Sequence, residues 1–176
     1  GVIGNNSPIT SRGAAKAGQF IQLCEQSGTP LLFLCNTTGF IVGTEAEQTG
    51  IIKHGAKFIQ AVTNCTVPKI TIITRKAYGG AYCVMNSKHI RGDFNFAWPT
   101  AEIAVMGPDG AVNIVYRREL GQAGDKADAV RKKYVDEYRD KFANPFVAAE
   151  RGYVDEVIEP AVTRPKLISA LRLLES

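Results

Sequence analysis

Hydrophobic positions in the first 75 residues alternate between two patterns, which are helical spacing and short uninterrupted apolar runs. Two segments repeat apolar residues at helical spacing and predict two helix faces: Ala14, Gly18, Ile21 and Cys24, then Ile52, Ala56, Ile59 and Val62. We expect the first helix to stop at Gly28 and Pro30. Residues 31–36 and 69–75 are short apolar runs, typical of parallel strands covered by helices on both sides. Residues 1–6 read as the end of a further strand, so we expect the chain to be part of a larger protein.

The second half of the chain continues the alternation. Residues 94–99 and 102–107 predict two short strands, and residues 109–117 predict a helix. The densely charged residues 125–142 predict a surface helix lying on the body of the domain, with one apolar stripe: Ala127, Val130, Tyr134, Tyr138 and Phe142. A short helix, a stop at Gly152 and a short strand follow, and Thr163 opens a last helix. The pattern therefore predicts one α/β domain, residues 1–176.

Composition excludes several classes of function. The formal charge of +4 is spread along the chain without a basic block, so we expect no nucleic-acid partner. No apolar run is long enough to cross a bilayer, so we expect no membrane partner. The four cysteines are widely separated and include no C-x-x-C pair, which favours reduced thiols, a cytoplasmic location and no metal site.

Two glycine-bearing turns carry the candidate chemistry. They span residues 36–40 and 77–81, each after an expected strand, and the carboxyl ends of parallel strands share one crevice. The backbone N–H groups that follow Gly79 would open a helix and could stabilise a negative oxygen by roughly 3 to 4 kcal/mol each. The alternative is that the glycines only permit a tight turn, and the local sequence favours neither interpretation.

Side chains able to catalyse a reaction are scarce. His54 and His89 fit surface or packing positions, and Glu45 and Glu47 fit the cap of a helix beginning near Gly50. Cys83 falls in the first turn after the glycines, where a thiol can be acidified. Because no histidine is near it in sequence, we favour a small apolar liner of the pocket over a nucleophile.

Residues 74–112, TRKAYGGAYCVMNSKHIRGDFNFAWPTAEIAVMGPDGAV, resemble the C-terminal carboxyltransferase domain of the beta subunit of biotin-dependent acyl-CoA carboxylases of the propionyl-CoA and acetyl-CoA type. The resemblance extends over nearly the whole chain, including residues 1–6, 43–62, 67–82 and 142–164. It implies a crotonase-like fold of β-β-α superhelical type. It also implies a subunit with two such domains, of which this chain is one.

The resemblance implies that carboxybiotin supplies both the carboxyl group and the base, and that the acyl-CoA thioester captures the carbon dioxide. Gly80 and Ala81 would hold the biotin oxygen through backbone N–H groups, while the oxyanion hole for the thioester lies in the N-terminal domain. The expected biotin and substrate pocket comprises Gly39, Phe40, Tyr78, Gly79 and Cys83. Expected partners are the biotin carboxylase and biotin carrier subunit, the N-terminal carboxyltransferase domain and further copies, which form a hexamer in the family. A eukaryotic member would lie in the mitochondrial matrix.

Two differences from the family pattern fall in the pocket. The first turn, Asn36 to Phe40, has neither the aspartate nor the proline of the usual D-x-P-G-F pattern, and the Cys83 position is often Asp or Ile. The acyl length therefore does not follow from this sequence. Alternatives to the carboxylase are a biotin-dependent decarboxylase subunit, and an inactive biotin-recognition or assembly module when the domain is isolated. A stand-alone hydratase is disfavoured, because no glutamate pair follows a glycine turn.

Overall fold

The computed structural model describes residues 1–175 and contains one parallel sheet. Its strands in chain order are β1 (Val2–Gly4), β2 (Leu31–Thr37), β3 (Lys69–Tyr78), β4 (Phe94–Ala97), β5 (Glu102–Ala104) and β6 (Glu156–Val157). The sheet order is β1-β2-β3-β4-β6, and β5 pairs with the end of β3. The predicted strand at residues 69–75 therefore runs three residues further, because Lys76 to Tyr78 pair with β5.

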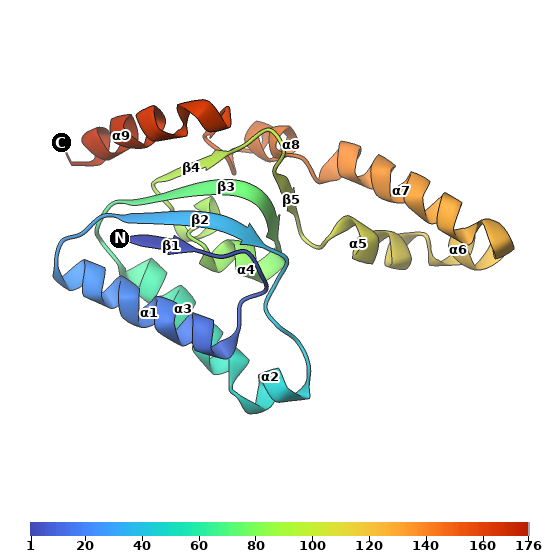
Figure 1. Ribbon diagram of the computed structural model, residues 1–176, viewed down its shortest axis with the longest axis horizontal. Coiled ribbons are helices and arrows are strands. Elements are labelled where there is room, and N and C mark those ends of the chain that lie inside the picture. The colour runs from blue at the N-terminus through green and yellow to red at the C-terminus, as the bar shows by residue number, and fades with distance from the viewer. Residues whose placement is uncertain (176) are drawn as a thin grey trace.

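Helices cover one face of the sheet as the apolar runs predict (Figure 1). α1 (Ser11–Gln26) and α3 (Ile51–Asn64) pack against each other there, with the short α4 (Gly79–Val84) beside them. The predicted face of α1 is confirmed, since Ala14, Gly18, Ile21 and Cys24 are all buried. α2 (Thr44–Gln48) is a short helix between the first glycine turn and α3.

α9 (Thr163–Leu174) covers the opposite face of the sheet (Figure 1). Its apolar residues pack against Ile70, Ile72 and Phe96 of the central strands. The indole N–H of Trp98 donates to the Thr163 hydroxyl over 3.0 Å, which fixes the first turn of the helix. The central strands are thus buried between two helical layers.

Three helices form an arm that projects from the body (Figure 1). They are α5 (Pro108–Val115), α6 (Arg117–Gln122) and α7 (Ala127–Phe142), and α8 (Pro145–Glu150) leads back to the body. Short 3-10 turns occupy Lys88–Ile90, Gly124–Lys126 and Pro160–Val162. The predicted helix at residues 125–142 is confirmed, but its predicted place on the body is wrong. The first part of its apolar stripe faces α5 and α6 instead, and the Tyr134 ring stacks at 4.0 Å on Tyr116 between these helices, whereas Tyr138 and Phe142 line a hollow with Tyr82 and Ile103 of the body.

Candidate functional site

The chain passes from β3 into α4 without an intervening loop. β3 ends at Tyr78, and α4 begins at Gly79, whose φ is +55°. Gly80 is exposed and Ala81 is buried. Their N–H groups belong to the first helical turn, where an α-helix has no acceptor of its own, and no side chain caps this end. The junction therefore presents backbone donors beyond the carboxyl end of a central strand.

An apolar hollow of about 490 Å³ lies beside this junction. Thr37 at the end of β2 is paired with Ala77 near the end of β3, so the two glycine turns are neighbours. The same hollow is lined by Phe40 from the first turn, by Gly80 from the second turn and by Cys83 from α4. The prediction that both turns face one crevice is confirmed.

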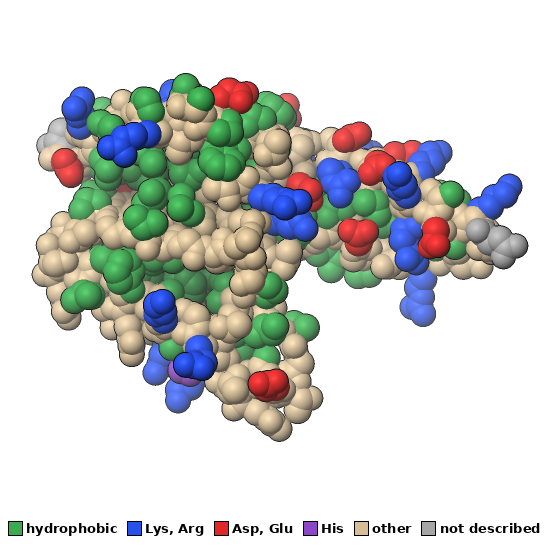
Figure 2. All heavy atoms as spheres, viewed as in Figure 1, with side chains coloured by type: hydrophobic (Ala, Val, Ile, Leu, Met, Phe, Trp, Pro, Cys, Tyr) green, Lys and Arg blue, Asp and Glu red, His purple; other side chains and the backbone are tan. Residues whose placement is uncertain are grey.

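α3 supplies the facing wall of the hollow, including Ile52 and Ala56. The predicted face of α3 is confirmed only in its second half, because Val62 is buried and Ile59 packs against the core, whereas Ile52 is 80% exposed. Figure 2 shows hydrophobic side chains gathered above α2, in the notch between the body and the arm. The exposed apolar residues of α3 thus form a wall of the candidate site.

Three of the predicted pocket residues do not line this hollow. The Tyr78 ring turns toward β5 and the start of the arm, where its hydroxyl donates to the Glu102 carboxylate. Gly79 is half-buried beneath the turn. Gly39 shapes the first turn, since its carbonyl accepts the N–H of Ile9 over 2.9 Å. The structure therefore brings together Phe40, Gly80 and Cys83 at the hollow, whereas Gly39, Tyr78 and Gly79 lie around it and the buried Ala81 does not line it.

The hollow offers little ionisable chemistry. Burial raises the pKa of the Cys83 thiol, and the hydrogen bond with Ser87 opposes this only in part. The raised pKa disfavours an acidified thiol at this position, and the place of Cys83 in the lining agrees with an apolar liner. Glu47 is the one carboxylate among the described residues that line the hollow. It lies in the first turn of α2, so the expectation that Glu45 and Glu47 cap the helix near Gly50 is wrong.

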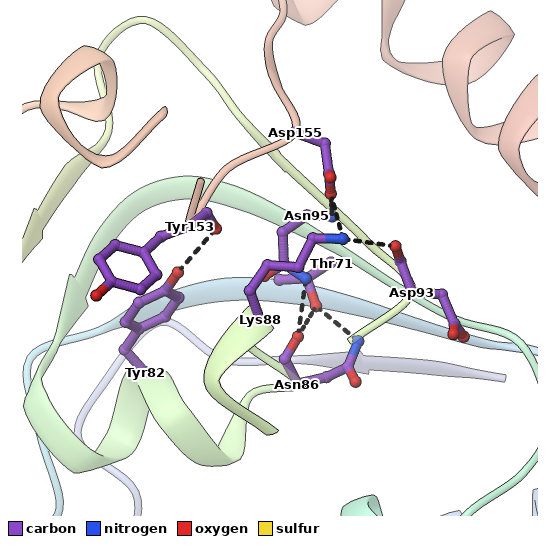
Figure 3. Close-up of polar contacts among 8 residues, drawn as sticks. All are labelled: Thr71, Tyr82, Asn86, Lys88, Asp93, Asn95, Tyr153 and Asp155. Carbon is purple, nitrogen blue, oxygen red and sulfur yellow. Dashed lines mark hydrogen bonds and ion pairs between the residues drawn. The ribbon is translucent and has the colours of Figure 1, made fainter. Parts of the chain in front are cut away.

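A buried polar cluster fixes the far end of α4 (Figure 3). Thr71 Oγ1 on β3 lies 2.9 Å from the Asn86 carbonyl oxygen and accepts from Asn86 Nδ2 over 3.1 Å. Asn95 Nδ2 on β4 donates to the same Asn86 carbonyl over 3.1 Å. Just beyond, the Lys88 ammonium pairs with the Asp155 carboxylate at 2.9 Å. Sequence reasoning missed this cluster, because its members are far apart in the chain and polar residues in strands carry no periodic signal.

Both histidines lie away from the hollow. His89 is exposed, and its ring stacks on Tyr153 with centroids 4.5 Å apart. His54 is half-buried beside α1. Among the side chains that the structure describes, those of residues 1–124 and 126–175, no group of three or more His, Cys, Asp or Glu could hold a metal ion. Over the same range, no helix combines the length and the apolar character that a bilayer span requires.

Comparison with known proteins assigns the chain to a family. The family described as carboxyl transferase domain matches residues 1–176. The chain belongs to this family. The carboxyl transferase domain therefore extends over the whole of the described structure, including the arm.

Curated relatives agree with this assignment. The domain is 54% identical over 172 residues to the propionyl-CoA carboxylase carboxyltransferase subunit of Haloferax mediterranei, covering 98% of this chain and 33% of the relative. It is 51% identical over 179 residues to the biotin-dependent acetyl-/propionyl-coenzyme A carboxylase beta5 subunit of Mycobacterium leprae, covering 97% and 33%. It is also 51% identical over 160 residues to the methylmalonyl-CoA decarboxylase subunit alpha of Propionigenium modestum, covering 91% and 31%. The chain thus spans about a third of the length of these relatives.

A solved structure confirms the fold. Transcarboxylase 12S, described as a hexamer assembly with methylmalonyl-coenzyme A and methylmalonic acid bound, superposes with a TM-score of 0.87 at 45% identity. The match covers 94% of this carboxyl transferase domain and 32% of the transcarboxylase chain. The expected α/β, crotonase-like fold is therefore confirmed.

Proposed function

We propose that this domain is the C-terminal carboxyltransferase domain of a biotin-dependent acyl-CoA carboxylase, acting on a short-chain acyl-CoA such as propionyl-CoA or acetyl-CoA. The observation that carries the proposal is the β3–α4 junction, where the N–H groups of Gly80 and Ala81 belong to the uncapped first turn of α4 and Gly80 lines an apolar hollow. The names of the Haloferax and Mycobacterium relatives support the substrate class and the use of biotin.

The junction suits the ureido group of biotin. A Cβ atom on Gly80 would meet nothing within 4 Å, so a ligand can approach the backbone closely. Carboxybiotin, when bound, supplies the carboxyl group and the base. The protein therefore needs donors for a negative oxygen and a place from which water is excluded, but no basic side chain.

Each residue then has a defined task. The N–H groups of Gly80 and Ala81 donate to the oxygen that gains negative charge, each contributing roughly 3 to 4 kcal/mol. Phe40 and Cys83 line the apolar wall beside that oxygen and exclude water, which strengthens both hydrogen bonds. Gly39, Tyr78 and Gly79 hold the two turns in shape. The donors for the thioester oxygen would come from the N-terminal domain of the subunit, and a biotin carboxylase and carrier subunit would deliver the biotin.

The remaining two thirds of a relative's length leaves room for that N-terminal domain. The hexamer named for transcarboxylase 12S supports a homo-oligomer in which domains of neighbouring copies complete the site.

A decarboxylase subunit is the second candidate, because the Propionigenium relative has that name at 51% identity. The same backbone donors serve carboxyl transfer in either direction, so the β3–α4 junction is compatible with both functions. Gene neighbours distinguish the two functions: a biotin carboxylase favours synthesis, whereas a membrane decarboxylase subunit favours decarboxylation.

The test uses the full-length subunit with its biotin carboxylase and biotinylated carrier, and follows labelled bicarbonate into propionyl-CoA and acetyl-CoA. Gly80→Pro removes one donor at a position in the first helical turn, where proline is tolerated, and should lower kcat by about 100-fold to 1,000-fold. Gly80→Ala keeps the N–H and is the matched control. Equal turnover in the two variants would remove the oxyanion assignment, and no transfer in either direction with any short acyl-CoA would overturn the proposed function.

A further inference from the structure

One of the two connections between the arm and the body lies at the β3–α4 junction itself. β5, which leads into the arm, pairs only with the last three residues of β3, from Lys76↔Glu102 to Tyr78↔Ala104. The chain then passes over the junction, where a Cβ atom on Gly107 would lie 3.1 Å from the Tyr78 ring. Any displacement of the arm's base therefore acts on Tyr78, which immediately precedes Gly79.

A polar chain crosses the same contact and ends on the arm. The Tyr78 hydroxyl donates to one oxygen of the Glu102 carboxylate. The other oxygen of Glu102 lies 3.3 Å from Nε of Arg139 on α7. These three residues thus connect β3, β5 and the arm helix by a phenol, a carboxylate and a guanidinium.

The hydrogen bond between Tyr78 and Glu102 is strong because both side chains are largely buried. Tyr78 is 5% exposed, and the Glu102 side chain is 19% exposed. Burial, followed by the hydrogen bond and charge of Glu102, raises the pKa of the Tyr78 phenol, so the phenol remains a donor. Hydrogen bonds to an ionised carboxylate are stronger than neutral ones, and screening by solvent is weak at a buried site.

We infer that Tyr78, Glu102 and Arg139 form a positioning chain, which couples the orientation of the arm to the backbone donors of Gly80 and Ala81. The inference rests on the proposed function for its effect on turnover. None of the three side chains lines the hollow. They act through the backbone at Gly79, so they are positioning residues.

Activity of the full-length enzyme with its biotin partners gives the first test. Tyr78→Phe removes the hydroxyl but keeps the ring, and we expect kcat to fall about tenfold to 100-fold with little change in KM for the acyl-CoA. Glu102→Gln should lower kcat to a similar extent, again with little change in KM. The double variant should be no slower than the slower single variant, because both changes break one chain.

Arg139 provides a rescue and a control. Arg139→Gln should lower kcat, and Arg139→Lys should restore much of it by keeping the charge. Arg139 also pairs with Asp136 at 3.1 Å on the exposed surface of α7. Asp136→Asn breaks that pair alone, and it should leave kcat unchanged.

Hydrogen exchange of residues 79–84 gives a readout that does not depend on activity. In variants whose thermal unfolding matches the wild type, exchange in this segment should be faster for Tyr78→Phe and Glu102→Gln and unchanged for Asp136→Asn. Unchanged exchange in the first two variants, or additive losses of kcat in the double variant, would overturn the positioning chain. If the wild type transfers no carboxyl group, the proposed function fails. The exchange experiment still decides whether the positioning chain orders α4.

Discussion

A Cβ atom on Gly79 would lie 2.9 Å from the backbone oxygen of Val105. The same glycine has a φ of +55°, in the left-handed region that disfavours other residues. Both constraints act where β3 turns into α4, directly before the two proposed donors. Gly79 is thus required by the backbone of the junction, whereas the space at Gly80 is free.

Gly79→Ala should destabilise the protein by about 1–3 kcal/mol, through the strained φ and the contact with Val105. Gly80→Ala meets no contact, so its unfolding midpoint should match the wild type. Chemical denaturation of both variants checks the difference. Equal stability of the two variants would contradict the geometry of the turn.

Cys83 should be dispensable as a nucleophile. Its pKa lies above the ordinary value of 9.0 because of burial, so the thiolate is scarce at neutral pH. We expect slow alkylation by iodoacetamide at pH 7.5, with a rate that rises steadily with pH and does not level off below 9.0. The other three cysteines are buried, so the native protein reports mainly on Cys83. Cys83→Ala should keep most of the turnover, and fast alkylation together with a large loss in this variant would contradict the prediction.

A substitution that fills the hollow should impair ligand binding without lowering the stability of the fold. Cys83→Phe places a large ring among Phe40 and the wall of α3, in a hollow of about 490 Å³ that is open to solvent. We expect a higher KM or loss of turnover with an unfolding midpoint close to that of the wild type. Cys83→Ala is the matched control, and unchanged kinetics in Cys83→Phe would show that the ligand binds elsewhere.

Glu25 should make stability depend on pH in the acid range. Its carboxylate accepts from the Thr66 hydroxyl, the Cys65 thiol and the N–H groups of Val67 and Thr66, and these bonds lower its pKa from 4.5 to about 2. A carboxyl whose pKa is depressed by folding stabilises the protein above its unfolded pKa, and this contribution is lost as the pH falls from about 4.5 toward 2.

Glu25→Gln should therefore lower the unfolding midpoint at pH 7 and flatten its dependence on pH between about 4.5 and 2. Thermal unfolding across that range measures both effects. Glu45→Gln on the exposed α2 is the control. An unaltered acid profile in Glu25→Gln would show that the carboxylate is not held by these donors.

Thr71→Val should cost about 1–3 kcal/mol, because it leaves the buried amide of Asn86 without its hydroxyl partner. Thr63→Val is the matched control, since that hydroxyl is exposed and bonds only to carbonyls of its own helix. Chemical denaturation compares the two variants. A small effect at Thr71 would mean that the polar cluster does not fix α4.

Local patterns in the sequence determined much of the fold. Leu31 to Asn36 predicted a buried strand because the run is apolar on both faces, and α1 was predicted because its buried residues recur at helical spacing. The glycine turn at residues 77–81 was located because Gly79 and Gly80 interrupt an apolar strand. Nearly chain-long resemblance then supplied the family, which the comparison confirmed.

Only the tertiary structure decided where surfaces lie. Ile52 and Ala56 share the helical spacing of Ile59 and Val62, yet they line the hollow, whereas Phe58 and Val62 of the same helix lie in the core. α7 has an amphipathic stripe, but a stripe does not specify its partner, and here the partner is α5 and α6. Tyr78, Glu102 and Arg139 are up to 61 positions apart, so their chain of contacts exists only once β5 joins the end of β3. Periodicity predicts which residues face away from water, whereas tertiary packing determines which residues they contact.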